Sequence, residues 1–395
     1  MPNVPPLRFP EFSGEWEKCQ LQQIASISKG SGISKEQLSD AGEPCILYGE
    51  LYTKYKSEVI DEVISKTNID STHLIRSLKN DVIIPSSGET AIDISTARCV
   101  PYDNILLGGD LSIIRLKEQD GRFFSYQLNG VRKPDIAKVA QGVSVVHLYG
   151  DSLSKLLVSY PTLKEQYKIA DFLHKLDQRI ATQIRVIEDL QTLKKAISTQ
   201  LLYGGSLKDI ISLAELGTLK NGYAFKSSTY CENGNYNIIT IANVTGERYV
   251  SADCNRVLDQ PCDIQEHQLL KENDILISLT GNVGRVSLNK GTCNLLNQRV
   301  GLFELRDNSL REYIFQVLST PQFESAMKNK GQGAAQMNIG KYDIEEYHIP
   351  YSIDHNELLK ISEILSLFDS KILMENKLLQ LFTQQKTFLL QKMFI

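Results

Sequence analysis

Residues 161–177 read Pro161-Thr-Leu-Lys-Glu165-Gln-Tyr-Lys-Ile169-Ala-Asp-Phe-Leu173-His-Lys-Leu176-Asp177. From Ile169 onward, apolar residues recur in steps of three and four, which is the spacing of one face of an α-helix. The pattern continues until Gly204-Gly205 ends it. About 40 residues at ~1.5 Å per residue make a helix roughly 60 Å long. The residues predicted to pack along its apolar stripe are Ile169, Leu173, Leu176, Ile180, Ile184, Ile187 and Leu190.

The same pattern returns later in the sequence, shifted by 192 residues, and predicts a second long helix that begins near Asp354 and Glu357. A long helix with one apolar stripe is not stable alone in water. We therefore expect the two helices to pack on each other as an antiparallel, coiled-coil-like pair. The packing residues predicted in the second helix are Ile361, Leu365, Phe368, Ile372, Leu379 and Phe382.

One position in the second stripe is polar, because Asn376 stands where the first helix has Ile184. Two interpretations are open. A buried asparagine can fix the register of paired helices. Alternatively, Asn376 lies at a widened edge of the pair that is open to water.

The repeat extends over the rest of the chain. Leu21–Gly30 matches Leu213–Gly222, and Lys79–Gly88 matches Glu272–Gly281. Gln141-Gly142 matches Gln332-Gly333 at nearly the same offset. Several matches in one order and at one offset indicate that the chain is two diverged copies of a unit of about 190 residues.

The part of each copy that precedes the helix has mixed character. Short β-branched runs such as Val82-Ile-Ile84 and Ile275-Leu-Ile277 are bounded by turn-forming residues, so they predict strands. The predicted fold class is α+β, with two mixed α/β domains in tandem and a long helix after each. The predicted bounds are 1–160 and 206–349 for the globular domains, and 161–205 and 350–395 for the helical segments.

Composition fits a soluble globular protein of two or three domains. The chain has 395 residues, of which 42% are hydrophobic and 23% charged. No apolar run approaches the ~20 residues of a membrane helix, and the first residues do not resemble a secretory signal. The seven cysteines are scattered without a Cys-x-x-Cys pair. We expect reduced thiols, no metal site, no membrane contact and a location in the cytoplasm.

The sequence offers little for catalysis. Gly281–Arg285 resembles a phosphate-binding loop in its glycines but lacks the required spacing and lysine. The only Pro-Pro pair, Pro5-Pro6, precedes Leu7 and not an aromatic residue, so it is not an adenine methyltransferase motif. A metal nuclease needs converging carboxylates near a lysine, but Glu15 and Glu17, which stand beside Lys18, have no paired acid before them. No two histidines are four residues apart, as a zinc hydrolase would require. We expect no catalysis, cofactor or metal in this chain.

Three stretches resemble the specificity subunits of type I restriction–modification systems. They are Leu7–Phe12 with the following Trp16, Tyr160–Asp177 with its second copy, and Asn297–Val300. The resemblance covers essentially the whole chain. The second copy departs from the pattern because Glu357 is not followed by glutamine and two residues are inserted after Pro350.

This resemblance implies that each globular part is a target-recognition domain that reads one half of a split site in double-stranded DNA. It also implies that the paired helices space the half-sites and dock methyltransferase subunits, two in number, which methylate adenine. Restriction subunits would join this assembly. The methyl donor, ATP and Mg²⁺ would then belong to the partners.

The negative charge of the chain limits how strongly it could bind DNA by itself. The net charge is −4, and neither globular part is basic: residues 1–160 carry −3 and residues 204–349 carry −3. Phosphate contacts supply much of the affinity for DNA, so we expect weak DNA binding by the chain alone. The alternative is a two-domain scaffold that binds proteins through its helices and does not bind DNA.

Base reading needs amides, hydroxyls and Lys or Arg on loops that reach a groove. For each single residue the competing interpretation is a turn or cap without DNA contact. In the first domain the candidates are Lys29, Ser31, Tyr48, Ser86, Ser87, Arg132, Lys133, Gln141, Ser144 and His147. In the second domain they are Lys220, Asn221, Tyr223, Lys226, Asn243, Thr280, Asn282, Gln298, Arg299, Gln332, Gln336 and Asn338.

Overall fold

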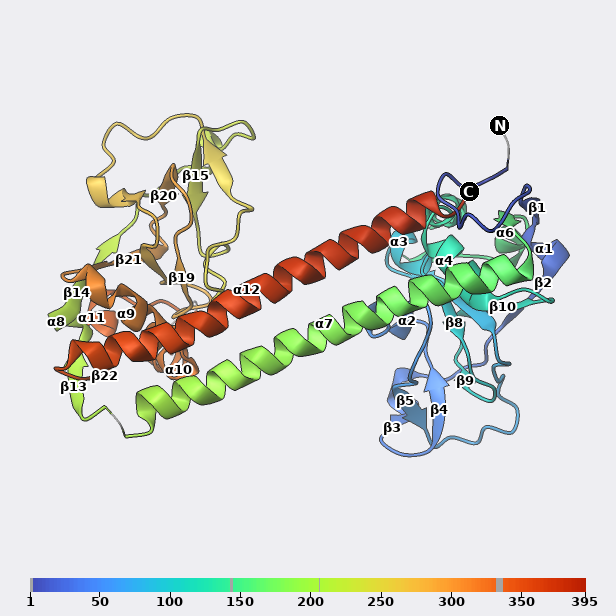
Figure 1. Ribbon diagram of the computed structural model, residues 1–395, viewed down its shortest axis with the longest axis horizontal. Coiled ribbons are helices and arrows are strands. Elements are labelled where there is room, and N and C mark those ends of the chain that lie inside the picture. The colour runs from blue at the N-terminus through green and yellow to red at the C-terminus, as the bar shows by residue number, and fades with distance from the viewer. Residues whose placement is uncertain (1–2, 143–144, 206, 332–336) are drawn as a thin grey trace. The chain divides into compact units, whose positions relative to one another are not determined.

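The computed structural model describes residues 3–142, 145–205, 207–331 and 337–395 (Figure 1). The chain forms two compact units: unit 1 is Met1–Ile184 with Lys377–Ile395, and unit 2 is Arg185–Asn376. Two long helices, α7 (Leu163–Tyr203) and α12 (His355–Lys392), contribute one half each to both units. Each unit is therefore one globular part together with two half-helices.

The globular part of unit 1 contains two four-stranded sheets. The main sheet is antiparallel and has the order β2-β10-β6-β8; the second has the order β3-β5-β4-β9 and contains one parallel pair, β4 with β9. The strands are β1 (Glu17–Gln20), β2 (Ala25–Lys29), β3 (Leu38–Ser39), β4 (Glu43–Ile46), β5 (Ser65–Thr67), β6 (Asp81–Pro85), β7 (Ser87–Gly88), β8 (Arg98–Val100), β9 (Leu106–Leu107), β10 (Leu111–Leu116), β11 (Val146–His147) and β12 (Leu157–Tyr160). The short helices are α1 (Leu21–Ile24), α2 (Glu50–Thr53), α3 (Ala91–Ile94), α4 (Gly121–Asn129), α5 (Lys133–Val139) and α6 (Gly150–Ser154).

Unit 2 repeats this topology. Its main sheet has the order β14-β21-β18-β19, and its second sheet, β16-β15-β20-β17, again contains one parallel pair, β15 with β20. The strands are β13 (Asp209–Ser212), β14 (Gly217–Asn221), β15 (Tyr236–Ile239), β16 (Asn255–Val257), β17 (Leu269–Leu270), β18 (Ile275–Ser278), β19 (Val286–Leu288), β20 (Asn294–Leu296), β21 (Val300–Leu305) and β22 (His348–Tyr351). The helices are α8 (Leu213–Leu216), α9 (Arg311–Leu318), α10 (Pro321–Lys330) and α11 (Lys341–Glu345). The predicted fold class and duplication are confirmed.

The repeated Asn-Asp pair has a structural reason. Asn80 and Asn273 both have positive φ, at 80° and 65°, a conformation that asparagine adopts more readily than most residues. The aspartate that follows each of them accepts a backbone hydrogen bond at the start of a central strand, 2.8 Å from the Leu78 nitrogen to Asp81 and 2.7 Å from the Lys271 nitrogen to Asp274. The motif therefore builds the same turn before β6 and before β18.

The central strands are apolar on both faces because each face is covered. In β6, Val82 and Ile84 join a core with Phe123 of α4, whereas Ile83 points into a separate core shared with the second sheet. In unit 2, Ile275 and Ile277 pack with the helices and Leu276 with the second sheet. Alternation across a strand with two covered faces gives the continuous apolar runs seen in the sequence.

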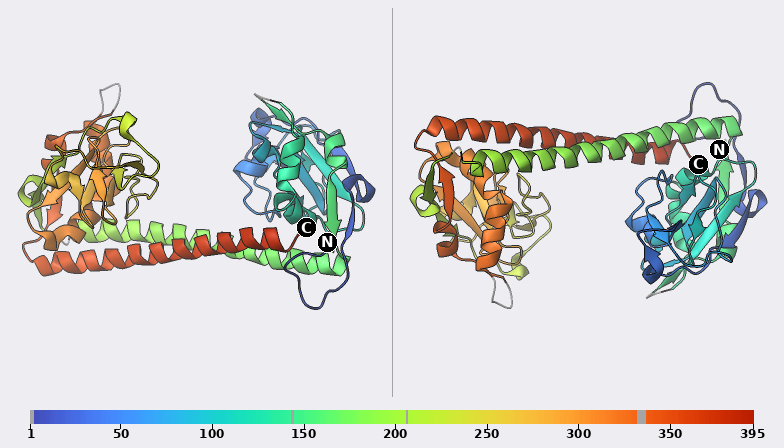
Figure 2. Two further views of the ribbon diagram at one scale, coloured as in Figure 1. Left: turned by 90° about the horizontal axis from the view of Figure 1, so that it is seen from above. Right: turned by 90° about the horizontal axis from the view of Figure 1, so that it is seen from below.

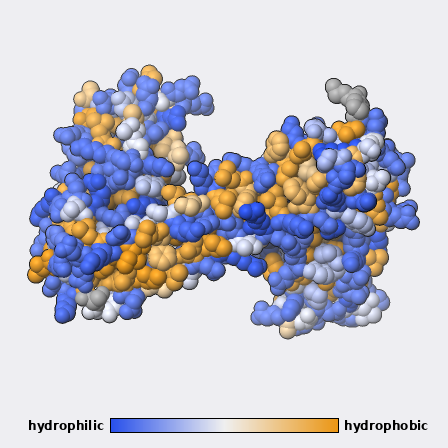
Figure 3. Space-filling view, in the orientation of Figure 1, coloured by the Kyte–Doolittle hydropathy of each residue, from blue (hydrophilic) through white to orange (hydrophobic). Residues whose placement is uncertain are grey.

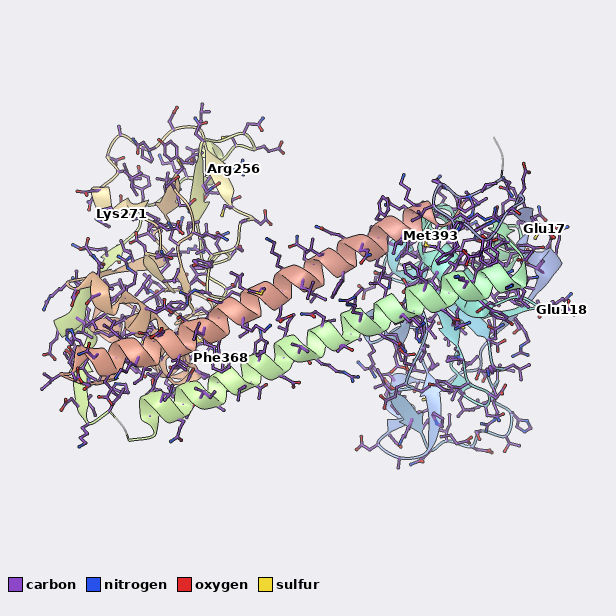
Figure 4. The ribbon with its side chains drawn as sticks, viewed as in Figure 1. Glu17, Glu118, Arg256, Lys271, Phe368 and Met393 are labelled. Carbon is purple, nitrogen blue, oxygen red and sulfur yellow. The ribbon has the colours of Figure 1, made fainter. Side chains whose placement is uncertain are left out.

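The long helices pack antiparallel within each unit (Figure 2). In unit 1, Ile169 and Leu173 near the start of α7 share a core with Phe382 and Leu389 near the end of α12. In unit 2, Leu202 at the end of α7 shares a core with residues near the start of α12, among them Leu358 and Ile361. Met393 inserts among unit 1 side chains, whereas Phe368 lies in unit 2 (Figure 4).

Most predicted packing residues are at least half-buried, but Ile184 is 36% exposed and Gln183 is buried instead. Including Ile184 in the stripe was therefore wrong. A coiled-coil seam alternates steps of four and three, and after Ile180 the next step of three arrives at Gln183. The same spacing after Ile372 arrives at Glu375, which explains why Asn376 is exposed. Of the two interpretations of Asn376, the open edge is correct.

The segment before the first domain ties α7 to α12. Both carboxylate oxygens of Glu165 on α7 accept hydrogen bonds from the Arg8 guanidinium, each at 2.7 Å. The Leu7 nitrogen donates to the Lys392 carbonyl at 2.9 Å. Trp16 is only 3% exposed and packs on Phe123 with ring centroids 5.6 Å apart. These contacts fix the Leu7–Trp16 segment against the start of α7 and the end of α12.

Candidate nucleic-acid interface

In unit 1, one edge of the main sheet gathers several predicted residues. Lys29 ends β2 and is paired with Ser112 at the start of β10. The Ser112 hydroxyl lies 2.8 Å from that of Ser86, and Ser87 is paired with His147 across β7 and β11. Four segments that are distant in sequence therefore meet at this edge, called the unit 1 loop edge below.

The equivalent edge of unit 2 is assembled by backbone hydrogen bonds. The Gln298 nitrogen donates to the Tyr223 carbonyl at 2.9 Å, and the Leu279 nitrogen donates to the Arg299 carbonyl at 3.0 Å. Thr280 is bridged to Asn338. The unit 2 loop edge thus joins the ends of β14 and β18 with the start of β21 and the segment before α11.

Nine predicted residues at or near these edges are exposed to solvent. The His147 ring stacks near that of Tyr149 with centroids 6.3 Å apart, and Tyr149 is 49% exposed. Tyr149 was not predicted, although it stands two residues after His147 and period-two spacing in an extended segment places such side chains together. The exposed predicted residues are Lys29, Gln141, His147, Asn221, Lys226, Asn282, Gln298, Arg299 and Asn338.

Two predicted base readers, Asn243 and Arg132, are held by hydrogen bonds to backbone carbonyls of their own unit, which counts against a role in base reading. Asn243 is 1% exposed: its amide oxygen accepts from Thr240, and its amide nitrogen donates to the Asp253 carbonyl at 2.8 Å. Arg132 donates to the carbonyl of Ile395 at 3.0 Å and pairs with Asp135. Side chains that satisfy internal carbonyls shape a loop or hold a chain end, and they are not free to reach a base.

Other candidates are partly engaged within their own unit. Burial lowers the pKa of Lys133, whose ammonium lies 3.4 Å from the Thr96 hydroxyl. The Tyr223 hydroxyl donates to Asp263 at 2.9 Å, which raises the pKa of Tyr223. Ser86 and Ser87 are buried, Tyr48 is half-buried, the Ser31 hydroxyl accepts from the Ile75 nitrogen, and Lys220 lies 3.4 Å from Glu304. Ser144, Gln332 and Gln336 lie outside the described residues.

Thr280 differs from these residues. Its hydroxyl oxygen is buried and has no hydrogen-bond partner among the residues that the structure describes. A buried polar atom without a partner is uncommon in folded proteins. Thr280 itself is half-buried at the unit 2 loop edge, where it is bridged to Asn338.

A buried ion cluster joins the two long helices in unit 1. Lys386 of α12 lies 2.6 Å from Asp177 of α7 and also pairs with Glu58. Asp177 accepts a further hydrogen bond from the Tyr126 hydroxyl at 2.7 Å. Burial lowers the pKa of Lys386, but the two carboxylates outweigh burial and the pKa is raised. Burial also raises the pKa of Glu58, and Lys386 opposes this effect only in part.

Unit 2 has an equivalent cluster in which an arginine and a glutamine replace the second acid and the tyrosine. Lys194 of α7 lies 2.5 Å from Asp369 of α12. The Asp369 carboxylate also accepts hydrogen bonds from Arg248 at 3.0 Å and from Gln316 at 2.7 Å. The spacing is the same on both helices, since 17 residues separate Asp177 from Lys194 and 17 separate Asp369 from Lys386. These reciprocal pairs, not Asn376, provide the polar contacts that match one antiparallel register.

Neither a metal centre nor a membrane segment is found in the described part of the chain. No three His, Cys, Asp or Glu side chains within 3–142, 145–205, 207–331 and 337–395 come together as metal ligands. Over the same residues, no helix combines the length and apolar character that crossing a bilayer requires.

The duplicated fold makes this a tandem-domain protein with an equivalent loop edge in each copy. Residues 13–191 and 206–384 each match the family described as type I restriction modification DNA specificity domain. The chain belongs to this family and carries two such domains in tandem. It is thus a type I restriction–modification specificity protein, as the resemblance in its sequence predicted.

Similar proteins extend over nearly the whole chain. The type I restriction enzyme MjaVIII specificity subunit of Methanocaldococcus jannaschii is 23% identical over 403 residues, which cover 94% of this chain and 89% of that protein. The S subunit of a type I restriction–modification system from M. genitalium has a similar fold, with a TM-score of 0.65, 18% identity and 99% of both chains covered. A structure from work on complex assembly and conformational transition of the type I R-M system gives a TM-score of 0.57 at 14% identity, with 98% of both chains covered.

Proposed function

We propose that this chain selects a bipartite, asymmetric site in double-stranded DNA, with one half-site read by each domain. The observation that carries this proposal is that equivalent loop edges present different side chains. The unit 1 edge exposes Gln141, His147 and Tyr149, whereas the unit 2 edge exposes Gln298, Arg299 and Asn338. Amides and arginine make bidentate contacts with purine edges in the major groove. Different side chains on one fold are what two different half-sites require.

The paired helices would set the distance between the half-sites. Half-sites on one face of DNA lie roughly one turn, about 10 bp, apart from centre to centre. A helix is a stiff spacer, and the reciprocal pairs of Asp177 with Lys386 and Asp369 with Lys194 hold the helices in register.

The same helices would dock the methyltransferase subunits. The exposed side of α12 carries apolar side chains, with Leu367 64%, Leu373 50% and Met374 64% exposed, and Figure 3 shows apolar surface over this helix. An exposed apolar patch of this kind marks an interaction site. Two methyltransferase subunits would dock, restriction subunits would join them, and adenine methylation with its methyl donor, ATP and Mg²⁺ would reside in those partners. The complex would act in the cytoplasm, and this chain would contribute no catalysis.

The acidic charge of both domains affects which subunits would contact the DNA phosphates. Because residues 1–160 and 204–349 each carry −3, most phosphate contacts would come from the partners. We expect the isolated chain to bind DNA more weakly than ~1 µM at physiological salt, within the range of non-specific binding. A fluorescence anisotropy titration measures this, and nanomolar affinity of the isolated chain would contradict the charge argument.

The decisive experiment maps methylated adenines in the host genome with and without this gene. The proposal expects one split, asymmetric motif that disappears on deletion and returns on complementation. The same acidic charge favours a second candidate, a scaffold that docks proteins without touching DNA. Unchanged methylation after deletion, together with retained partner binding, would support the scaffold and reject DNA selection.

A further inference from the structure

One loop of the main sheet is longer in unit 1 than in unit 2. In unit 1 the loop between β6 and β8 spans residues 86–97, whereas the equivalent loop of unit 2, between β18 and β19, spans 279–285. The additional residues of unit 1 include the one-turn helix α3. No helix occurs within 279–285, all of which the structure describes. Because loops on a rigid scaffold often carry function, the side chains that α3 presents are of interest.

The helix α3 is attached to the unit 1 loop edge. It lies against β7 and β11, the two short strands that pair Ser87 with His147. Ile94, on the inner side of α3, is fully buried in the same core as Val146 of β11. The approach is close, since a Cβ atom added to Gly88 of β7 would lie 2.5 Å from the Ile94 Cγ2 atom. α3 is therefore part of the loop edge.

Hydrogen bonds at both ends hold this turn in one conformation. The Thr90 hydroxyl accepts a hydrogen bond from the Asp93 nitrogen at 3.1 Å and donates one to the Asp93 carboxylate at 2.6 Å. After the turn, the Ser95 hydroxyl donates to the Ala91 carbonyl at 2.6 Å. Such caps stabilise a helix end. The backbone of α3 is therefore fixed, and so is the position from which each of its side chains projects.

The apolar side chain that α3 presents to solvent is Ile92. It is 66% exposed, whereas Ile94 of the same turn is fully buried. Exposure alone would say little, because single apolar side chains are common on protein surfaces. The position of Ile92 beside the loop edge sets it apart. The nearby Glu89 is exposed, and a broad apolar partner surface would have to desolvate its carboxylate at a high cost.

The base edges of DNA offer one apolar group that an aliphatic side chain can contact. In the major groove only thymine presents a methyl group, and the other groups there are hydrogen-bond donors and acceptors. The minor groove fits less well, because its negative potential attracts Arg and Lys and would repel the carboxylates of Glu89 and Asp93. In the major groove a carboxylate can accept a hydrogen bond from the cytosine amino group. The surroundings of Ile92 therefore favour the major groove.

The equivalent loop of unit 2 presents a polar side chain instead. Gly281 stands where unit 1 has Gly88, and within 279–285 the exposed residue is Asn282. The apolar residue that follows, Val283, is fully buried. A contact between this loop and a thymine methyl group would therefore be made by the first domain alone.

We propose that Ile92 contacts the methyl group of a thymine in the half-site that the first domain reads. The inference rests on the proposed function, because it names one base contact within the same bipartite site. Ile92 would add selectivity for thymine to the hydrogen bonds that the polar side chains of the unit 1 loop edge make.

The test uses the complex of this chain with its methyltransferase subunits and duplexes that contain the mapped motif. Each thymine of the motif, on either strand, is replaced in turn by deoxyuridine, which pairs like thymine but lacks the methyl group. Wild type is compared with Ile92→Ala and with Ile64→Ala, which changes a 54% exposed isoleucine of unit 1 outside residues 86–97. Competition titrations measure relative affinity. Calorimetry checks the fold, and the melting temperature of Ile92→Ala should equal that of wild type because Ile92 is exposed.

Wild type should bind about fourfold more weakly when one particular thymine of one half-site is replaced, which is the loss expected for one methyl group that is no longer buried. Ile92→Ala should bind that duplex and the thymine duplex equally, and Ile64→Ala should keep the preference for thymine. A wild-type complex that is indifferent to every replacement overturns the proposal. So does an Ile92→Ala complex that keeps the wild-type preference for thymine; if its methyltransferase binding is also weakened, Ile92 contacts a partner protein instead. If the wild-type complex shows no sequence-specific binding, the proposed function itself has failed.

Discussion

Replacing Lys386 with methionine should destabilise unit 1 strongly. Methionine keeps much of the side-chain volume but removes the ammonium group that neutralises Glu58 and Asp177. Both acids are buried, at 6% and 5% exposure. Breaking a buried ion pair by removing one partner costs about 3–5 kcal/mol, because a buried charge is left uncompensated. In a unit of this size that loss corresponds to a decrease in melting temperature of roughly 6–20 °C.

Lys194→Met is the matched control, since Lys194 occupies the equivalent position in unit 2. Its partner Asp369 keeps Arg248 at 3.0 Å and Gln316 at 2.7 Å. We therefore expect a smaller loss, about 1–2 kcal/mol, closer to the cost of one charged hydrogen bond.

Differential scanning calorimetry of the full chain compares the two variants with wild type. Adding Glu58→Gln to Lys386→Met should recover part of the loss, because one of the two uncompensated acids is then neutral. Equal destabilisation by Lys386→Met and Lys194→Met, or a loss below ~1 kcal/mol for Lys386→Met, would refute the reasoning about buried charge.

Three further predictions concern pH, base reading and loop structure. The pKa of Glu58 is raised in the folded chain, so its protonation favours folding: its contribution is fully present below the unfolded pKa of about 4.3 and is lost as pH rises through the folded value. Glu58→Gln should flatten this part of the stability–pH curve, and an unchanged curve in calorimetry from pH 4 to 8 would contradict the assignment. Arg299→Ala should cost about 1–3 kcal/mol of base discrimination and relax the methylated motif in one half-site only; sequencing of methylated DNA that shows both half-sites relaxed would reject the division of labour. Asn243→Ala should destabilise unit 2 by about 1–3 kcal/mol, because buried partners lose their hydrogen bonds, while the methylated motif remains that of wild type; an altered motif with unchanged melting would restore Asn243 as a base reader.

The candidate site was predictable as a set of loops but not residue by residue. The sequence placed Lys29, Gln298 and Arg299 in turns beside apolar runs, and the structure has them at strand ends. The sequence could not distinguish Asn243 from Asn338, because both are asparagines in polar stretches. Asn243 is buried by contacts with Ser251, Asp253 and Cys254, whereas Asn338 is exposed. That difference depends on where each loop folds back on its own domain.

The sequence by itself determined the duplication, the two long helices, the strand runs and the family, because these follow from periodicity and spacing along the chain. Only the tertiary structure decided that the helix seam passes Gln183 and not Ile184. Only the structure showed that Lys386 pairs with Asp177 as Lys194 pairs with Asp369. Periodicity depends only on residues that are close together in the sequence, so it can be recognised without the structure. The partner of a charged side chain is set by contacts between residues that are distant in sequence, and no local pattern records them.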